Sequence, residues 1–288
     1  MNLIAAKLRG VSYIYSEKTP FMKVAVDNVD AAFEEGMITG IIGHTGSGKS
    51  TIAQMINGLL RPSAGNVIVG GRDIWEKPKE IRNVRFEAGL VFQYPEYQLF
   101  EETVKKDIAF GPSNMGLPAE ETETRVYEAM DFVGLDRSFA EKSPFDLSGG
   151  QKRRVAIAGI IAMRPRILIL DEPAAGLDPR GRDEILSRIC EYRSKYGASV
   201  VMISHSMEDM ARYCDRILVM NGGKVFMCGT CEEIFSEAER LESVGLTVPQ
   251  ITKLMLELKR RGFDVNTSVY TVDSAEAEIK RLLAGGAK

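Results

Sequence analysis

A glycine-rich segment near the N-terminus has the residues and spacing of a phosphate-binding loop. Its residues are Gly43, His44, Thr45, Gly46, Ser47, Gly48, Lys49, Ser50 and Thr51. In such a loop backbone N–H groups cradle phosphates, a lysine reaches the β- and γ-phosphates, a serine binds magnesium, and the following helix points its positive end at the anion. The sequence therefore predicts ATP and Mg²⁺ as ligands, with Lys49 on the phosphates and Ser50 on the metal.

Two adjacent carboxylates, Asp171 and Glu172, follow the wholly apolar run ILIL. Such a run suits a strand in the buried centre of a parallel sheet. Taken alone, an acidic pair after a strand is as often the start of a loop as a catalytic pair. Nucleotide hydrolysis, however, needs one carboxylate for magnesium and another group for the attacking water. Downstream of a phosphate loop, we predict Asp171 as a metal ligand and Glu172 as the catalytic base.

A third segment provides a second anion-binding surface. It consists of Leu147, Ser148, Gly149, Gly150 and Gln151, at the start of a predicted helix. A serine and two glycines there can aim N–H groups at an anion. With this segment the sequence resembles the ATP-binding cassette (ABC) family, in which such a signature covers the γ-phosphate bound by the opposite subunit. The resemblance implies that one chain makes only half of each ATP site.

The resemblance covers about residues 1 to 230 and implies roles for four further residues. Tyr15 is similar to the aromatic residue that stacks on adenine, with Tyr13 as the alternative. Gln93 is similar to the glutamine that joins the γ-phosphate and its metal to the transporter-facing subdomain. Asp178 is similar to a residue that communicates across the dimer. His205 is similar to the switch histidine on the γ-phosphate, although a lone histidine is more often structural.

The surrounding pattern predicts an α/β fold. Alternating apolar runs indicate early strands, GKSTIAQMINGLL indicates a helix from Gly48 to Leu60, and SVVMIS indicates a second buried strand after a crossover helix. A helical insertion is predicted between about Glu101 and Gly134, with an apolar stripe at Val126, Met130 and Val133. The family resemblance implies a phosphate-loop NTPase cassette with a RecA-like core, a helical subdomain and a small C-terminal α-rich extension.

The resemblance implies that the chain is divided into four segments. They are residues 1–92 (first part of the core), 93–160 (Gln93 loop and helical signature subdomain), 161–222 (second part of the core) and 223–288 (C-terminal extension, for dimerisation or packing). The extension contains two helix candidates. In one of them Pro249 suits the first turn, Ile251, Leu254, Met255 and Leu258 form a stripe that favours packing, and Gly262 ends the helix.

The composition argues against a nucleic-acid-binding protein and against a membrane-spanning or secreted one. The 288 residues carry a formal net charge of −3, so no charge excess indicates a nucleic-acid partner. No apolar stretch approaches the ~18–20 residues that cross a bilayer, and the start lacks the zones of a signal peptide, which predicts a cytoplasmic location. Cys228 and Cys231 form a CxxC pair, which we interpret as structural or incidental because a zinc site needs two further ligands.

Finer features resemble the A2-type ATPase of energy-coupling-factor (ECF) transporters, which is CbiO-like. They are GHTGSGKST, FQYPEYQLF, DIAFGPSNMGLP, FDLSGGQKRRVAIAGIIA and LDEPAAGLDP. The resemblance implies an importer of vitamins or transition-metal ions and a peripheral place at the cytoplasmic face of the membrane. A soluble ABC ATPase and a single-ATPase cobalt or nickel importer subunit remain alternatives.

The resemblance also implies partners. They are a second ABC ATPase (an A1-type paralogue, or another copy of this chain), a membrane scaffold T component and a substrate-binding S component. A groove beside Gln93 would accept coupling helices of the scaffold, and Glu96, Glu101 and Glu102 lie where they could meet basic residues of such helices.

Overall fold

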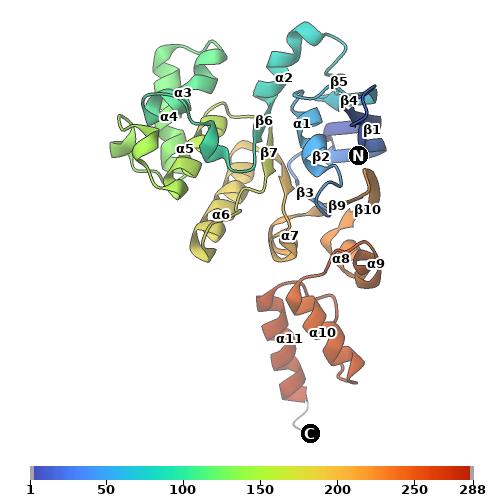
Figure 1. Ribbon diagram of the computed structural model, residues 1–288. Coiled ribbons are helices and arrows are strands. Elements are labelled where there is room, and N and C mark those ends of the chain that lie inside the picture. The colour runs from blue at the N-terminus through green and yellow to red at the C-terminus, as the bar shows by residue number, and fades with distance from the viewer. Residues whose placement is uncertain (1–2, 286–288) are drawn as a thin grey trace.

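The strands form two sheets (Figure 1). The computed structural model describes residues 3–285. The strands are β1 (Ile4–Tyr15), β2 (Lys23–Glu34), β3 (Ile38–Ile42), β4 (Ala64–Val69), β5 (Arg72–Asp73), β6 (Ala88–Val91), β7 (Ile167–Asp171), β8 (Ser199–Ile203), β9 (Arg216–Asn221) and β10 (Lys224–Thr230). The larger sheet has the order β10-β9-β3-β8-β7-β6 and is parallel except for β10, whereas the antiparallel sheet has the order β2-β1-β4-β5.

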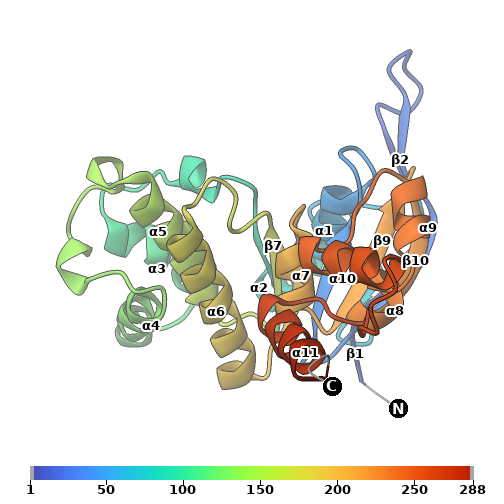
Figure 2. The ribbon, with the colours of Figure 1, turned by 90° about the horizontal axis from the view of Figure 1, so that it is seen from below.

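Two groups of helices stand apart from the others in space. The α-helices are α1 (Lys49–Ile56), α2 (Ile81–Glu87), α3 (Val104–Asn114), α4 (Ala119–Phe132), α5 (Gly149–Ile161), α6 (Pro179–Tyr196), α7 (Met207–Tyr213), α8 (Cys231–Phe235), α9 (Ala238–Ser243), α10 (Gln250–Arg260) and α11 (Val272–Gly285). Short 3₁₀ helices are η1 (Pro78–Glu80), η2 (Pro95–Gln98), η3 (Arg137–Phe139) and η4 (Pro144–Asp146). Helices α3, α4 and α5, which we call the helical group, gather beside the parallel sheet, whereas α10 and α11 form a hairpin beyond it (Figures 1 and 2).

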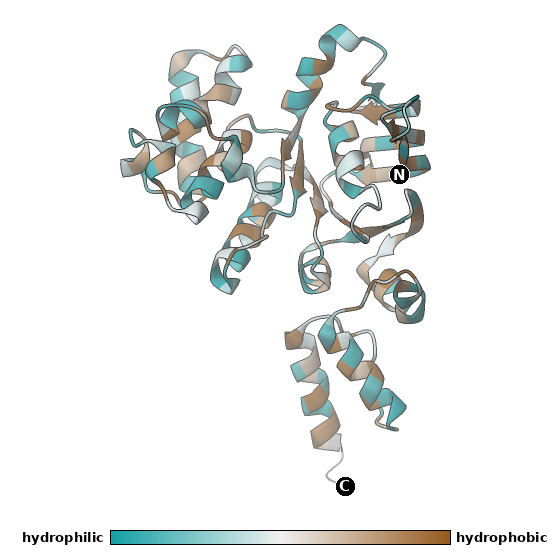
Figure 3. Ribbon diagram, in the orientation of Figure 1, coloured by the Kyte–Doolittle hydropathy of each residue, from teal (hydrophilic) through white to brown (hydrophobic). Residues whose placement is uncertain are grey.

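Strand β7, which lies between β8 and β6, is buried on both faces. Leu168 and Leu170 belong to a core shared with α3 to α6, whereas Ile167 and Ile169 belong to a core shared with α1 and the antiparallel sheet. Successive side chains of a strand point to opposite faces, so a strand covered on both sides has no polar position. The prediction of a buried parallel strand at ILIL is confirmed, and apolar colour runs along the central strands (Figure 3).

The helical insertion is confirmed as α3 and α4, with Val126 and Met130 fully buried. The prediction for α1 was too long. The helix ends at Ile56, and Gly58 has a φ of 73°, in the left-handed region that stops an α-helix. Leu59 is consequently left exposed beyond the helix end.

The better of the two helix candidates in the C-terminal segment is confirmed as α10, with Pro249 at its N-cap, but the described part of this segment also has β10 and four helices in place of two. The apolar stripe of α10 packs only in part. Met255 is fully buried against α11 and Ile251 and Leu258 are partly buried, but Leu254 is 44% exposed. The α10–α11 hairpin therefore has a small core of its own. Within residues 3–285 no helix combines the length and apolar character needed to cross a bilayer.

Candidate functional site

The predicted phosphate loop connects β3 to α1. Gly46 and Gly48 have φ angles of 81° and 101°, and a Cβ at Gly48 would lie 2.5 Å from the carbonyl oxygen of Ala25. Only glycine combines this conformation with so close an approach. The buried Lys49 ammonium donates hydrogen bonds to the carbonyl oxygens of Gly43 (2.7 Å) and His44 (3.0 Å). The loop is thus wrapped around its lysine.

Two buried polar atoms beside this loop lack a hydrogen-bond partner within the described residues. They are Ser47 Oγ and Glu172 Oε1. Buried polar atoms in native proteins are nearly always satisfied, so orphaned ones indicate a ligand or ordered water. An attacking water would satisfy the Glu172 carboxylate, and the pocket beside the loop is lined by Lys49, Ser50 and Thr51, so the residues present fit a nucleotide site.

The two predicted carboxylates lie at the end of β7, and they differ in backbone conformation. Asp171 is the last residue of the strand, whereas Glu172 has a φ of 53° and its N–H donates to the carbonyl oxygen of Ile203 (3.0 Å). A non-glycine residue in this region costs on the order of 1–3 kcal/mol and clusters at active sites. The turn directs Glu172 toward His205, whose Nε2 lies 3.5 Å from Glu172 Oε1.

The charges at this site perturb one another. Burial, and next the nearby Asp171, raise the pKa of Glu172 to about 7. Burial also raises the pKa of Asp171, while a hydrogen bond from Ser50 and the charge of Lys49 act in the opposite direction. Burial lowers the pKa of Lys49 and, together with Lys49, that of His205. Four titratable groups with shifted pKa values in one place are typical of a catalytic site.

The raised pKa of Glu172 predicts a pH-dependent stability of the chain without nucleotide or metal. In the unfolded chain the carboxyl ionises near its ordinary value of 4.5, but in the folded chain only near 7. The free energy of unfolding therefore falls as pH rises between these values. A shift of one pKa unit corresponds to about 1.4 kcal/mol, so the decrease reaches up to about 3 kcal/mol. Glu172→Gln removes this loss.

In urea unfolding the stability of Glu172→Gln relative to wild type should rise by about 2–3 kcal/mol between pH 5 and pH 8. The same substitution at exposed Glu191, on α6, is the control and should show no such trend. A difference between Glu172→Gln and wild type that does not change with pH would contradict the assigned environment of Glu172.

Beside the loop, Tyr15 and Lys23 line a pocket of about 140 Å³ together with Gly46, Lys49 and Thr51. Tyr15 is the last residue of β1, lies opposite Lys23 in the antiparallel ladder, and shares a hydrogen bond of 3.2 Å with the Thr51 hydroxyl. Of the two candidate aromatics, Tyr15 lines the pocket, whereas Tyr13 packs against a core and meets Tyr15 edge-on at 4.8 Å.

Lys23 is a residue that sequence reasoning missed. Its Nζ lies 3.8 Å from the position that a Cβ on Gly46 would occupy, and the described residues offer it no ion pair. Only the cross-strand register with Tyr15, which is not readable from the local sequence, brings this lysine to the phosphate loop.

The predicted signature segment does open a helix. Ser148 is the N-cap of α5, its Oγ accepts from the N–H of Gln151 (3.4 Å), and Gln151 Oε1 accepts from the N–H of Ser148 (2.9 Å). Leu147 is buried, whereas Ser148, Gly149 and Gly150 are exposed. Helix α5 lies with the helical group and α1 on the other side of the sheet, so the structure does not bring the signature and the phosphate loop together (Figures 1 and 2).

The other three predicted residues are exposed at loops around the parallel sheet. Gln93 follows β6, and His205 follows β8 near Glu172. Asp178 caps α6, where its Oδ1 accepts from the N–H of Gly181 (2.8 Å). Gln93, Glu172 and His205 therefore lie after the carboxyl ends of neighbouring parallel strands, where ligands of such sheets bind.

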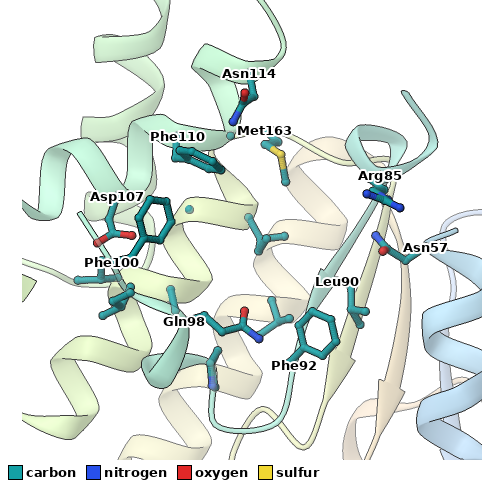
Figure 4. A pocket seen from close by; sticks show the side chains of 18 of the residues that line it. Asn57, Arg85, Leu90, Phe92, Gln98, Phe100, Asp107, Phe110, Asn114 and Met163 are labelled. Atoms are coloured by element: carbon teal, nitrogen blue, oxygen red, sulfur yellow. The ribbon is translucent and has the colours of Figure 1, made fainter. Parts of the chain in front are cut away.

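A second pocket, of about 390 Å³, lies between the parallel sheet and the helical group (Figure 4). Its lining is mostly apolar and comes from α2, β6, η2, α3 and α5, with Phe92, Phe100, Phe110 and Met163 among the larger side chains and Gln98 and Asp107 among the polar ones. We call it the helical groove. It is adjacent to Gln93, whose neighbour Phe92 lines it, as the family resemblance implied, although its lining residues were not predicted.

The three acidic residues suggested for partner contacts have different surroundings. Glu96 is not available, because it is mostly buried and paired with Arg153. Exposed Glu102, just before α3, pairs with Lys106 on that helix, and the N–H of Glu101 donates to Asp107 (3.1 Å). The prediction for Glu96 is therefore wrong.

The two CxxC cysteines lie on different elements. Cys228 is exposed on β10, whereas the thiol of Cys231, the first residue of α8, donates to the carbonyl oxygen of Cys214 (3.0 Å).

The chain is similar to known proteins in sequence and in structure. Residues 26–175 match the family model described as "ABC transporter". The energy-coupling factor transporter ATP-binding protein EcfA2 of Caldanaerobacter subterraneus subsp. tengcongensis is 57% identical over 97% of this chain and 98% of its own length. Its counterpart from Clostridium perfringens is 50% identical over 97% and 99%.

Two solved structures are similar as well. CbiO1 of Clostridium perfringens, described as part of the ABC transporter complex CbiONQ, has a TM-score of 0.74 at 38% identity and covers 89% of this chain and all of its own. The ATP-binding cassette MJ0796, solved as a dimer in a post-hydrolysis state with ADP and Pi, has a TM-score of 0.72 at 28% identity and covers 78% and 98%.

Proposed function

The chain is an ABC ATPase of the energy-coupling factor transporter ATP-binding protein family, and we propose that it powers uptake of vitamins or transition-metal ions by closing on ATP with a second ATPase chain. The observation that carries this proposal is the convergence of Asp171 and Glu172, at the end of β7, and His205, after β8, on Lys49 of the glycine loop. The names of the relatives support this function over a soluble ABC ATPase or a single-ATPase cobalt or nickel importer.

Hydrolysis depends on positioning and electrostatics. The N–H groups of the loop and Lys49 bind the β- and γ-phosphates, Tyr15 stacks on adenine, and His205 steadies the γ-phosphate. Glu172 accepts a proton from the attacking water, for which a pKa of about 7 is well suited. Ser50, Asp171 and Gln93 would hold Mg²⁺, which supplies neutralisation of phosphate charge when bound.

The second ATPase chain completes each site. Ser148, Gly149 and Gly150 present open backbone at the exposed start of a 13-residue helix, where N–H groups and the helix dipole favour a phosphate. No part of this chain's own phosphate loop is near them. We infer that they cover the ATP bound by the partner, an A1-type paralogue or a second copy, and that Asp178 meets the partner at the same interface.

The membrane partners are proposed from the helical groove. An amphipathic helix places its apolar face in such a groove, and Phe100 and Phe110 provide aromatic walls for it. A coupling helix of a T component fits this description. The chain would then lie at the cytoplasmic face of the membrane through its partners, and an S component would select the transported substrate.

Lys23 should contribute to nucleotide affinity. Its ammonium lies over the phosphate loop but is exposed, so the gain from a phosphate contact is that of a solvated ion pair. Lys23→Gln is expected to weaken ATP binding about 2- to 5-fold at low salt and less at high salt. Calorimetry with ATP and with adenosine checks this, because adenosine binding should not change. The control is exposed Lys79→Gln, and an equal loss for adenosine would contradict a phosphate contact.

The proposal as a whole is tested by affinity purification of this chain from detergent-solubilised native membranes, with mass spectrometry of the copurifying proteins. Recovery of a second ATPase and a multi-span membrane protein is expected, and small membrane proteins with them would identify substrates. Recovery of this chain alone, or with ribosomal or DNA-bound proteins, would contradict the transporter role and leave the ATPase without its proposed task.

A further inference from the structure

Arg153 of α5 and Glu96 of η2 form a buried ion pair that the proposed chemistry does not use. Their side chains are 4% and 16% exposed, with Nε 3.1 Å from Oε2 and Nη2 2.9 Å from Oε1. The remaining nitrogen, Nη1, donates to the carbonyl oxygen of Ala175, and the guanidinium lies 5.8 Å from the Tyr94 ring centroid. One arginine thus holds two segments that are far apart in sequence.

One of these segments lines the helical groove, and the other follows the catalytic Glu172. Pro95 and Gln98, which flank Glu96 in η2, line the helical groove. Ala175 follows the catalytic carboxylate, and its N–H donates to the carbonyl oxygen of Glu172 (3.1 Å). A chain of direct contacts therefore runs from the groove through Glu96, Arg153 and Ala175 to the backbone of Glu172, and Arg153 itself lies on the signature helix.

The chemistry of the pair makes this connection stiff. A bidentate arginine–carboxylate contact fixes orientation as well as distance, and the third contact uses the same planar group. A buried charge that loses its partner is strongly unfavourable, so η2 cannot move away from Arg153 without a new partner for both. Displacement of η2 must therefore move α5 or the loop at Ala175.

Arg154, the next residue of α5, is a natural control. It makes a similar bidentate pair, with Glu184 at 2.9 and 3.0 Å, and also donates to a backbone carbonyl, that of Val133 (2.9 Å). Its partners lie on α6 and after α4, away from both the groove and the Glu172 loop.

We propose that Arg153 and Glu96 are positioning residues that link the helical groove to the loop of the catalytic Glu172. The inference rests on the proposed function, in which a membrane partner occupies the groove and ATP the phosphate loop. Through this link, ATP at the site sets the position of η2, and a partner in the groove sets the position of Glu172. Coupling between two sites is reciprocal, so it can be measured from either one.

The test is hydrogen–deuterium exchange of the full chain with and without AMP-PNP and Mg²⁺, followed in residues 173–178 and 94–100. In wild type and Arg154→Lys the analogue should slow exchange in both segments. Arg153→Lys keeps the positive charge but cannot make the bidentate contact with Glu96. In this variant and in Glu96→Gln, the analogue should still slow exchange in residues 173–178. Its effect on residues 94–100 should fall about 2- to 30-fold.

Binding affinity for AMP-PNP, measured in the same samples, separates the two proposals. A wild-type chain that does not bind the analogue contradicts the proposed function and the link together. If Arg153→Lys and Glu96→Gln both bind AMP-PNP normally and the analogue slows exchange in residues 94–100 as much as in wild type, the link alone is overturned. An equal loss of the effect on residues 94–100 in Arg154→Lys also overturns the link, because the loss would then come from a change in helix α5 and not from the Arg153 contacts.

Discussion

Glu172→Gln should abolish ATP turnover while ATP binding persists. Glutamine has nearly the same shape but cannot accept a proton from water, so the variant loses general-base catalysis, which contributes about 10²- to 10⁴-fold. Lys49 and the glycine loop, which would hold the phosphates, are unchanged. In the complex with its partner chain the variant should accumulate a closed state with ATP trapped, because the contacts of the γ-phosphate are not lost.

Phosphate release and filter binding of labelled ATP measure the two quantities in one preparation. Glu191→Gln, an exposed carboxylate on α6, is the matched control and should keep both turnover and binding. Turnover of Glu172→Gln at the wild-type rate would show that another group activates the water. Loss of binding in the same variant would show that Glu172 acts on the ground state.

Ser148→Arg should inactivate the ATP site of the partner chain and spare nucleotide binding by this chain's own loop. The long side chain fills the open space before Gly149 and Gly150, and loss of the N-cap costs about 1 kcal/mol of helix stability. Removing preorganised donors from a developing charge lowers turnover about 10²- to 10³-fold. The isolated variant should therefore bind ATP normally, whereas the assembled complex should lose the activity of one site.

The control for this prediction is Ser143→Arg. Ser143 also caps a short helix of the helical subdomain, where its Oγ accepts from the N–H of Phe145 (3.3 Å), but it lies outside the signature. Full ATPase activity of the complex with Ser148→Arg would contradict a shared site, provided that the variant is present in the complex at the normal ratio.

Local patterns were sufficient to predict where in the fold many of the candidate site residues lie. The phosphate loop combines glycines that adopt left-handed angles with a lysine and a serine after them. The two carboxylates follow an apolar run that forms a buried strand. Occurring in this order, these patterns indicate a nucleotide site. The same reasoning placed the signature at a helix start, and there the structure shows that Ser148 and Gln151 cap each other.

Residues brought together by long-range contacts could not be predicted in this way. Lys23 reaches the phosphate loop only through its register with Tyr15, and Glu96 meets Arg153 across 57 positions of sequence. From sequence alone Glu96 is indistinguishable from Glu101 and Glu102, since burial decides which acid is paired inside. The C-terminal helices were miscounted because α8 and α9 are too short to display a periodic apolar face.

The central claim is that two chains close on ATP and share it. Native mass spectrometry of the Glu172→Gln chain, copurified with its partner ATPase and exposed to ATP and Mg²⁺, tests this most directly. We expect a complex of two ATPase chains that retains ATP at this chain's own loop after excess nucleotide is removed, and that no longer holds ATP in the partner's site when Ser148→Arg is added. A chain that retains ATP by itself, with no ATP-dependent change in its association, would contradict the account.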